Sequence, residues 1–488
     1  MFSYNEIYNA YIDCRQNKRC KIDALHVEIN QEEILNDLIV ELNSRCYQPT
    51  TSVCFYITKP KPREIFAADF RDRIIHHVLY NRISPLWERI FIDQSFACRP
   101  EKGTHKAANA LRTYSRKITQ NGKTRAYFLK MDIRNFFMSI DKHILYKLLV
   151  DKCNGKELKW LIHRLIFHDP TTDYRMMGPE ILKAKIPAQK SLFNTCNTRG
   201  LPIGNLTSQF FANVYLNELD HYVKHILKCR FYVRYVDDFL LLSKNMNELW
   251  MWKTQIGLFL NKSLNLCVNP EATRIDSVFN GIDFVGYIIR PHYTICRRRV
   301  VGNFKTKLRA FEEILMLEDN EKKTFLYKTP ILDKLFATVN SYLGHFSHAN
   351  TDHLIGHLFD TYSFLRNYFF LNKLSVKRKY KCPKYVNTLK KQVNYFNKIF
   401  SDSLVFYQVG CYYETYLSHA ETLSHIMHYR LRSKWRGMKK ACGFHKRYLH
   451  KVCTTLEKEK ISYAIIKQTG RYLNFTMERE PILMMTYK

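Results

Sequence analysis

The sequence predicts a mixed α/β (α+β) protein with more than one domain, and three observations lead to this prediction. The chain has 488 residues, which is longer than most single domains. Because 46% of these residues are hydrophobic, a chain of this length can bury a large core. Segments of helical periodicity, such as residues 1–46, alternate with strand-like runs such as Ser52–Thr58. A basic, proline-containing stretch near residues 375–395 separates this pattern from a second α/β pattern.

The elements of the first half each have a local signal. A basic turn, KPKPREI, follows the first strand and leads to a helical pattern that begins at Phe70. We expect that helix to stop at the Ser84-Pro85 step, because proline lacks the N–H that a helix needs. Gly103 marks a turn before another helix, and an apolar strand-like run then ends at Asp132.

A glycine-rich turn opens the next part of the chain. Gly200 and Gly204 permit a close backbone approach to a ligand, and a long helix follows them. The segment Phe231–Ser243 reads as two strands that meet in a tight turn, because both runs are aromatic or β-branched. Beyond Arg290 the pattern is mainly helical to about residue 375, and it becomes mixed again over 395–488.

The charge of the chain favours a polyanionic partner. The 77 Lys and Arg outnumber the 44 Asp and Glu, which gives a net charge of +33, and such a field suits nucleic acid before a membrane surface. The 32 Tyr and 32 Phe include enough rings for some to stack on bases. The 14 cysteines form no CxxC pair, and the sequence shows neither a signal peptide nor a membrane-spanning run. We therefore expect a reduced, cytoplasmic protein with no membrane partner.

Three aspartates are the candidate catalytic and metal-binding residues. Asp237 and Asp238 fall at the turn of the predicted hairpin, and Asp132 ends the earlier apolar run. Carboxylates beside aliphatic walls are costly to bury unless a cation or a proton compensates them. The alternatives are a solvated turn for Asp237 and Asp238 and a helix cap for Asp132. Three carboxylates at two strand ends suit phosphoryl transfer assisted by two Mg²⁺ ions, with Mn²⁺ as a possible substitute.

Four ordered motifs resemble the palm of reverse transcriptases. They are AYFLKMDIRNFF, LPIGNLTSQ, YVDD and GIDFVGY, and the segments KPREI, SFACRPEKGTHKA and NSYLGHFSHAN resemble the fingers and thumb of bacterial members. The resemblance implies a right-hand polymerase with N-terminal helices and fingers over 1–125, a palm over 126–290 and a helical thumb over 291–380.

The resemblance also assigns roles to residues. It implies that Asp132 and Asp237 bind the metal ions with the help of Asp238, and that Phe137 is the ring that excludes a 2′-hydroxyl. Arg63 matches the arginine that grips the incoming triphosphate, assisted by Lys61 or Lys59, and a solvated basic turn is the alternative. The remaining deoxynucleotide contacts that the resemblance implies are Ile203, Gly204 and Gln209, and its primer grip consists of Phe284, Gly286 and Tyr287, of which the two aromatic residues could equally be core.

Two positions depart from the common pattern. Many family members have Gln where this chain has Ile203, and Pro where it has Gln209; the form IGNxxSQ is similar to the enzymes of diversity-generating retroelements, which copy adenine unfaithfully, and to the unknown-group, defence-associated enzymes. Ala272 stands where the family often has a lysine, so protonation of pyrophosphate would use Arg274 or be weak.

The C-terminal segment 395–488 resembles the mismatch-recognising N-terminal domain of MutS. The blocks LVFYQVGCYYETY, MKKACGFHKRYLHKV and YAIIKQTG carry the resemblance. It implies that Tyr412 is a wedge against a mispaired base and that Glu414 accepts a hydrogen bond from that base. The alternative is a retained fold that docks RNA, DNA or protein, and the ATPase motif of MutS is absent from the sequence.

The leading functional hypothesis is an RNA-directed DNA polymerase that makes cDNA in antiphage defence or in a diversity-generating retroelement. Its expected partners are an RNA template, which we expect to be non-coding, the DNA product and deoxynucleotides, with an accessory protein or a second copy left open. The alternatives are template-independent or protein-primed DNA synthesis, and a catalytically silent nucleic-acid scaffold. The pair His76-His77 is expected to pack or to contact nucleic acid, without a catalytic role.

Overall fold

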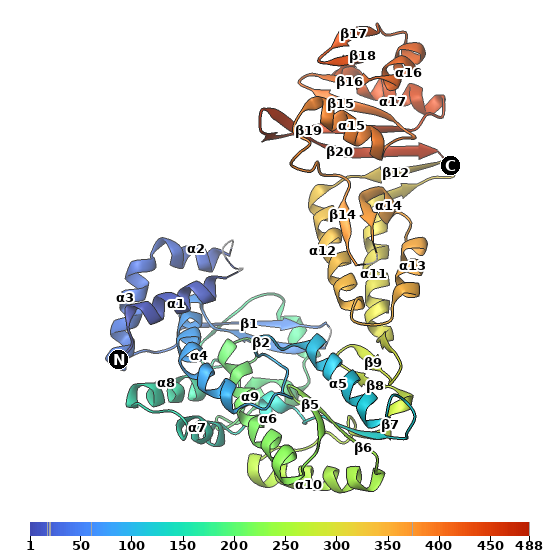
Figure 1. The fold of residues 1–488 in the computed structure, drawn as a ribbon. Coiled ribbons are helices and arrows are strands. Elements are labelled where there is room, and N and C mark those ends of the chain that lie inside the picture. The colour runs from blue at the N-terminus through green and yellow to red at the C-terminus, as the bar shows by residue number, and fades with distance from the viewer. Residues whose placement is uncertain (17, 19–20, 60, 373, 488) are drawn as a thin grey trace. The chain divides into compact units, whose positions relative to one another are not determined.

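The computed structural model describes residues 1–16, 18, 21–59, 61–372 and 374–487, and the chain divides into two compact units. The first unit comprises Met1–Thr294 and the second Ile295–Lys488 (Figure 1). Both contain helices and sheets, which confirms the predicted mixed α/β class.

The first unit contains ten helices and nine complete strands among its described residues. The helices are α1 (Tyr4–Arg15), α2 (Ile22–Ile29), α3 (Gln31–Asn43), α4 (Phe70–Ile90), α5 (Thr104–Ile118), α6 (Phe136–Ser139), α7 (Lys142–Val150), α8 (Lys156–Phe167), α9 (Leu206–His221) and α10 (Met246–Leu264). The strands are β1 (Ser52–Ile57), β2 (Arg63–Ala67), β3 (Tyr127–Met131), β4 (Tyr174–Met176), β5 (Phe231–Tyr235), β6 (Asp238–Ser243), β7 (Arg274–Ser277), β8 (Ile282–Phe284) and β9 (Tyr287–Ile289), and β10 (Thr294–Cys296) contains the boundary in the sequence.

A four-stranded antiparallel sheet forms the centre of this unit, with the strand order β5-β6-β3-β7. Helix α10 packs against β3 and β6, and α5 packs against β5 and β6, so helices cover the sheet on both sides (Figure 1). The four central residues of β6, Phe239–Leu242, are therefore all apolar, because both faces of the strand are buried there. This arrangement brings the ends of β3 and β6 together.

Helix α4 corrects one expectation from the sequence. The helix continues through Pro85 to Ile90, whereas the Ser84-Pro85 step was expected to end it. Ile83 and Trp87, on either side of the proline, are each only 1% exposed, so the burial of two large side chains outweighs the lost backbone hydrogen bond.

The second unit contains seven helices and a large sheet among its described residues. The helices are α11 (Arg298–Leu315), α12 (Thr329–Phe346), α13 (Asp352–Thr361), α14 (Leu365–Tyr368), α15 (Leu389–Ile399), α16 (Ser418–Met427) and α17 (Leu449–Lys458). The strands are β11 (Met316–Glu318), β12 (Lys322–Leu326), β13 (Phe369–Leu371), β14 (Val376–Arg378), β15 (Leu404–Val409), β16 (Tyr412–Tyr416), β17 (Arg432–Trp435), β18 (Met438–His445), β19 (Tyr463–Leu473) and β20 (Thr476–Tyr487).

The large sheet has eight strands in the order β11-β12-β20-β19-β15-β16-β18-β17. Its last six strands come from the C-terminal segment, but β11 and β12 form a hairpin that interrupts the helical region after residue 290. Strand β12 pairs with β20 from Lys322 opposite Tyr487 to Leu326 opposite Leu483. The sheet thus joins two segments that the sequence suggested were separate.

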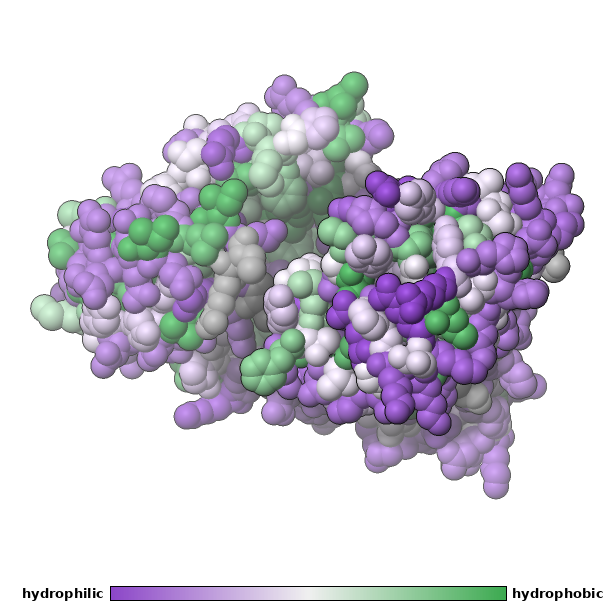
Figure 2. Space-filling view, turned by 90° about the horizontal axis from the view of Figure 1, so that it is seen from above, coloured by the Kyte–Doolittle hydropathy of each residue, from purple (hydrophilic) through white to green (hydrophobic). Residues whose placement is uncertain are grey.

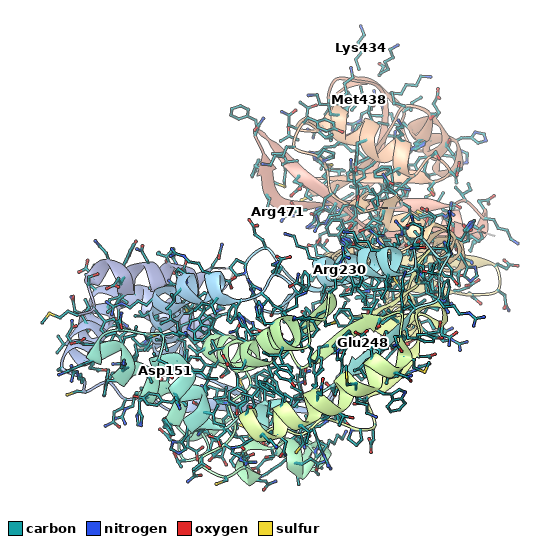
Figure 3. The ribbon with its side chains drawn as sticks, turned by 60° about the horizontal axis from the view of Figure 1, so that its bottom comes forward. Asp151, Arg230, Glu248, Lys434, Met438 and Arg471 are labelled. Carbon is teal, nitrogen blue, oxygen red and sulfur yellow. The ribbon has the colours of Figure 1, made fainter. Side chains whose placement is uncertain are left out.

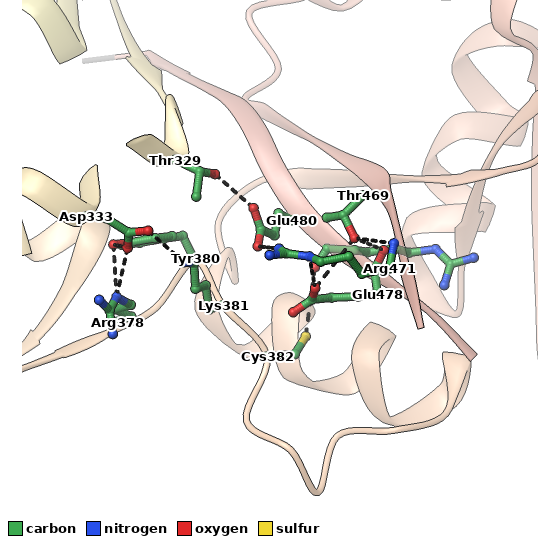
Figure 4. A network of polar contacts seen from close by, with 11 residues as sticks. Thr329, Asp333, Arg378, Tyr380, Lys381, Cys382, Thr469, Arg471, Glu478 and Glu480 are labelled. Atoms are coloured by element: carbon green, nitrogen blue, oxygen red, sulfur yellow. Dashed lines mark hydrogen bonds and ion pairs between the residues drawn. The ribbon is translucent and has the colours of Figure 1, made fainter. Parts of the chain in front are cut away.

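Polar contacts reinforce the same junction (Figure 4). The Glu480 carboxylate on β20 accepts hydrogen bonds from Thr329 Oγ1 at the start of α12, at 2.8 Å, and from Arg471 Nη2 on β19, at 2.7 Å. Farther along α12, the Asp333 carboxylate accepts from Arg378 and Tyr380 and pairs with Lys381. Connected networks of this kind hold the elements they join in one arrangement.

The visible surface of the chain is hydrophilic over most of its area, with hydrophobic side chains in small scattered groups (Figure 2). Among the described residues, none of the helices has the length and apolar character needed to cross a lipid bilayer.

We predict that Phe325→Ala weakens the whole second unit. Phe325 on β12 is 5% exposed and its ring lies 6.3 Å from that of Tyr368, so the truncation should cost about 3–5 kcal/mol of unfolding free energy. Hydrogen exchange should accelerate in β12 and in β20 together. Leu317→Ala on β11 is the control, because Leu317 is 56% exposed and should change stability by less than about 0.5 kcal/mol. Faster exchange confined to β12 would contradict the prediction.

Candidate active site

The two neighbouring aspartates lie at the turn of the β5–β6 hairpin. Tyr235 pairs with Asp238 across the hairpin, so Val236 and Asp237 form a two-residue turn. Val236 has φ 57°, in the left-handed region that a β-branched residue rarely adopts. Strain of this kind costs of order 1–3 kcal/mol and persists only where the surroundings enforce it.

Arg234 enforces this turn from beneath. Its side chain is fully buried, and its Nη1 donates a hydrogen bond to the carbonyl oxygen of Val236 at 3.0 Å. The guanidinium also binds both carboxylate oxygens of Asp220 on α9, at 2.6 and 2.7 Å. Further hydrogen bonds to Ser95 Oγ and Asn213 Oδ1 complete its environment, so the turn is anchored to a helix and a loop that are distant in sequence.

Asp132 lies beside this turn because of the sheet register. Met131 at the end of β3 is opposite Phe239 on β6, which brings Asp132 next to Asp238. Asp132 Oδ2 accepts a hydrogen bond from Asn269 Nδ2 at 3.2 Å, and its carbonyl oxygen accepts from the Asn269 backbone N–H at 2.8 Å. The structure thus brings together the three aspartates that the sequence singled out.

The pKa values of Asp237 and Asp238 are raised because these carboxylates are buried and lie close to other carboxylates. The pKa of Asp237 is raised to about 7, mainly by burial and also by the charges of Asp132 and Asp238, against the lowering effect of the Arg63 guanidinium. Burial also raises the pKa of Asp238 to about 6, against the lowering effect of Lys130, whose Nζ lies 3.1 Å from Asp238 Oδ2. Burial and repulsion disfavour the ionised form of these carboxyl groups, and a bound cation would stabilise that form.

The donor set fits a hard divalent cation. Asp238 Oδ1 is buried and has no hydrogen-bond partner among the residues that the structure describes, and carboxylate oxygens are the ligands that Mg²⁺ prefers. Within the described ranges, no three His, Cys, Asp or Glu side chains are already gathered into a metal cluster. Asp132, Asp237 and Asp238 are therefore the residues that would hold the ions, with the ions completing their arrangement.

Of the residues expected to contact a nucleotide, Arg63 lies near the aspartates, and Phe137 lies on the short helix α6 that follows Asp132. Arg63 begins β2, is exposed, and is near enough to lower the pKa of Asp237. Phe137 on α6 is partly buried, and its ring packs against that of Phe136 at 5.5 Å. Lys59 and Lys61 are both exposed, so the structure does not choose between them.

The loop before α9 is fixed to strand β2 rather than held open. The Ile203 carbonyl accepts from the Phe66 N–H at 2.9 Å, and Asn205 Oδ1 accepts from the Ala68 N–H at 3.0 Å. A Cβ at Gly204, where φ is 136°, would lie 2.7 Å from the Phe66 carbonyl oxygen, so glycine is needed for this backbone approach. Gln209 is exposed on α9 and remains available to a ligand.

The residues expected to grip a primer are mostly core. Phe284 and Tyr287 are fully buried on β8 and β9, and the turn between them consists of Val285, φ 41°, and Gly286, φ 96°. The Tyr287 hydroxyl lies 3.1 Å from His105 Nδ1. The rings of Phe284 and Tyr287 are therefore part of the core and are not exposed to a primer.

The two C-terminal candidates differ in exposure. Tyr412 is 51% exposed and its ring packs edge-on against His445 at 5.4 Å. Glu414 is 7% exposed, and its carboxylate accepts from the Tyr416 hydroxyl at 2.6 Å and from Trp435 and Arg436, both at 3.3 Å.

Two further positions have plain structural explanations. His76 is buried and its Nδ1 lies 2.7 Å from Thr207 Oγ1, so it packs within the first unit. Arg274 on β7 follows Ala272 by two residues. Its side chain is exposed and pairs with Asp276, so the charge of Arg274 lies at the surface.

Sequence reasoning missed the residues that hold the aspartates in place: Lys130, Asp220, Arg234 and Asn269. One signal was available, because an arginine within the apolar run FYVRYVDD must find an acidic partner if that run is a buried strand. Nothing in the sequence identified Asp220 as that partner.

Comparison with known families assigns two regions of the chain. Residues 57–289 match the family model described as reverse transcriptase (RNA-dependent DNA polymerase). Residues 387–482 match MutS domain I.

Two curated relatives match this chain over about three fifths of its length. The chain is 26% identical over 332 residues to Protein YkfC of Escherichia coli K12, which covers 60% of this chain and 80% of that protein. It is 24% identical over 366 residues to the group II intron-encoded protein LtrA of Lactococcus lactis subsp. cremoris, which covers 62% of this chain and 57% of that protein. A solved structure of telomerase from Candida albicans with a fragment of telomeric RNA is 15% identical, with a TM-score of 0.37, over 73% of this chain and 60% of that one.

We predict that Asp220→Ala lowers the unfolding free energy of the first unit by about 3–5 kcal/mol, because it leaves the Arg234 guanidinium buried without its counter-charge. Chemical denaturation measures the loss. Arg45→Ala is the control: its pair with Glu157 is partly exposed, and the change should cost about 0–1 kcal/mol. Equal effects of the two substitutions would show that the buried pair is not an anchor.

We also predict that the stability of the metal-free protein falls as the pH rises through about 7. The pKa of Asp237 is raised from its ordinary 3.8 to about 7, so the folded state keeps a proton that the unfolded state has already lost. The stabilisation is complete below the unfolded pKa and is lost as the pH passes the folded pKa. Urea titrations at pH 5–8 with a chelator should show a smaller decline for Asp237→Asn. The control Asp151→Asn removes an exposed carboxylate (Figure 3) and should leave the decline unchanged.

Proposed function

Because the chain belongs to the reverse transcriptase family and ends in a domain that matches MutS domain I, we propose that it polymerises deoxynucleotides on an RNA template by two-metal nucleotidyl transfer. The observation that supports this proposal most directly is the juxtaposition of Asp132, Asp237 and Asp238 at two adjoining strand ends, where one buried carboxylate oxygen has no hydrogen-bond partner within the described part of the chain.

The residues of this chain would divide the work. When bound, two Mg²⁺ ions supply a lowered pKa at the primer 3′-hydroxyl and neutralise the charge of the triphosphate. Arg63 would bind the triphosphate, because its fixed charge and paired N–H groups suit phosphate oxygens. Phe137 would occupy the space of a 2′-hydroxyl and so select deoxynucleotides. Arg234 would keep the turn that carries Asp237 in its strained conformation.

The domain assignment remains part of this proposal. In it, residues 1–125 supply the N-terminal helices and fingers, 126–290 the palm, 291–380 the thumb and 395–488 the MutS-like domain. The template would be an RNA, which the family likeness favours, and the high positive charge of the chain would hold it together with the DNA product.

Ile203 supports a second proposal, which concerns fidelity. Where many relatives have a glutamine, this chain has an aliphatic side chain that packs against the apolar cluster containing Phe66 and cannot hydrogen-bond a nascent base pair. Relaxed base selection of this kind would suit sequence diversification, whereas antiphage defence is the alternative role.

We expect Asp237→Asn to lower RNA-templated deoxynucleotide incorporation by about 10³-fold or more, since it removes a charged group on which transition-state stabilisation depends. The assay supplies one deoxynucleotide at a time to a defined template, and Asp151→Asn is the matched control. Incorporation that ignores the template would favour terminal transfer. Bound nucleic acid with no product from either protein would favour the scaffold.

Sequencing of the cDNA made by the unmodified protein tests the proposal on fidelity. Ordinary accuracy opposite template adenines would refute relaxed base selection.

A further inference from the structure

The β17–β18 hairpin of the second unit concentrates positive charge at the edge of its sheet. Strand β17 is the terminal strand of the eight, so one of its sides has no neighbouring strand. The eleven residues from Arg430 to Lys440 include six cationic side chains, all exposed: Arg430, Arg432, Lys434, Arg436, Lys439 and Lys440. Figure 3 shows Lys434 at the outer end of this hairpin, directed away from the body of the unit.

Most of this charge is not compensated within the chain. Arg436 pairs with Glu414 and Lys440 pairs with Glu421. Over the described part of the chain, no carboxylate forms an ion pair with the other four cations, Arg430, Arg432, Lys434 and Lys439. Exposed cations that repel one another at the edge of a sheet favour an anionic partner from outside the chain.

An aromatic ring lies among these cations. The guanidinium carbon of Arg432 is 4.5 Å from the centre of the Trp435 ring, and that of Arg436 is 5.5 Å from it. Arg436 and Gly437 form the two-residue turn of the hairpin, with φ 49° and 78°, where Trp435 pairs with Met438. Cations held over a ring are pre-organised, so less side-chain entropy is lost when they bind a partner.

Glu414 fixes the hairpin to the sheet instead of facing solvent. Its carboxylate binds the Trp435 indole N–H and the Arg436 guanidinium from the hairpin, and the Tyr416 hydroxyl from its own strand. A Cβ at Gly443 on the adjacent strand would lie 3.1 Å from Glu414 Cγ, so glycine leaves room for this side chain. A glutamate that is 7% exposed and already accepts three hydrogen bonds is poorly placed to accept another from a base.

We propose that the β17–β18 hairpin binds the phosphate backbone of nucleic acid, without regard to base sequence or mismatch. Glu414 is a positioning residue for this surface and not a reader of bases. The contacts come from the four uncompensated cations, and Trp435 supports them. The inference does not depend on the polymerase proposal, since it concerns a surface with no part in the chemistry.

The test is the binding of labelled oligonucleotides to the whole 488-residue chain, measured by fluorescence anisotropy over a series of salt concentrations. The probes are single-stranded RNA, single-stranded DNA and DNA duplexes with and without one mismatch. The hairpin variant combines Arg432→Gln, Lys434→Gln and Lys439→Gln. The control variant combines Lys398→Gln, Lys451→Gln and Lys458→Gln, which removes the same charge from exposed, unpaired lysines of the same unit.

We expect the hairpin variant to bind about 10- to 100-fold more weakly near 0.1 M salt, and the slope of log K against log salt to fall by about 2–3. The control variant should change neither value much. Matched and mismatched duplexes should bind equally well, and Glu414→Gln should not create or remove a preference between them. Polymerase activity on a short template should survive in the hairpin variant, which separates this inference from the proposed function.

Three outcomes would overturn the proposal. Equal losses in the hairpin and control variants would show that only net charge matters. A mismatch preference that Glu414→Gln abolishes would make Glu414 a base reader. Unchanged oligonucleotide binding combined with lost binding to vesicles of anionic phospholipid would assign the hairpin to a membrane surface.

Discussion

The buried ion pair between Arg234 and Asp220 is the interaction on which the candidate active site depends. Both side chains are completely excluded from solvent, so each charge would be very costly without the other. The same guanidinium holds the Val236 carbonyl, and thereby keeps a β-branched residue in a backbone conformation that it would otherwise avoid. A helix and a hairpin are thus locked together directly beneath two aspartates.

Above that anchor, the carboxylates are held in an arrangement that they disfavour. Burial and mutual repulsion raise the pKa of Asp237 and Asp238, and Lys130 and Arg63 offset only part of the effect. The favourable folding energy of the first unit must therefore offset the unfavourable energy of these buried, mutually repelling carboxylates. Divalent cations would reduce this repulsion, so the binding of the metal ions and the stability of the fold are linked.

The three aspartates of the candidate site could be singled out from the sequence because their signals are local. An aspartate at the end of an apolar run, or a pair of them at a hairpin turn, can be recognised from its immediate neighbours. Asp220 could not be recognised in the same way, because its partner lies on another element and its own helix gives no hint of the contact. The end of helix α4 was predicted wrongly for a related reason. The preference of proline against a helix interior depends on the local sequence, whereas the burial of Trp87 that outweighs it depends on tertiary packing. The position of Glu414 in a motif was not enough to predict its contacts, because they depend on Tyr416, Trp435 and Arg436, which surround it in the fold.

The eight-stranded sheet of the second unit has a consequence for synthesis of the chain. Strand β12 leaves the ribosome about 160 residues before the part of β20 that pairs with it. At typical elongation rates of about 5–20 residues per second, one edge of β12 stays without its partner for roughly 10–30 s. An unpaired strand edge is a template for unwanted association. Nascent chains on one messenger are close neighbours, so β12 is the segment through which they would pair with one another, and the one that a chaperone would have most reason to cover.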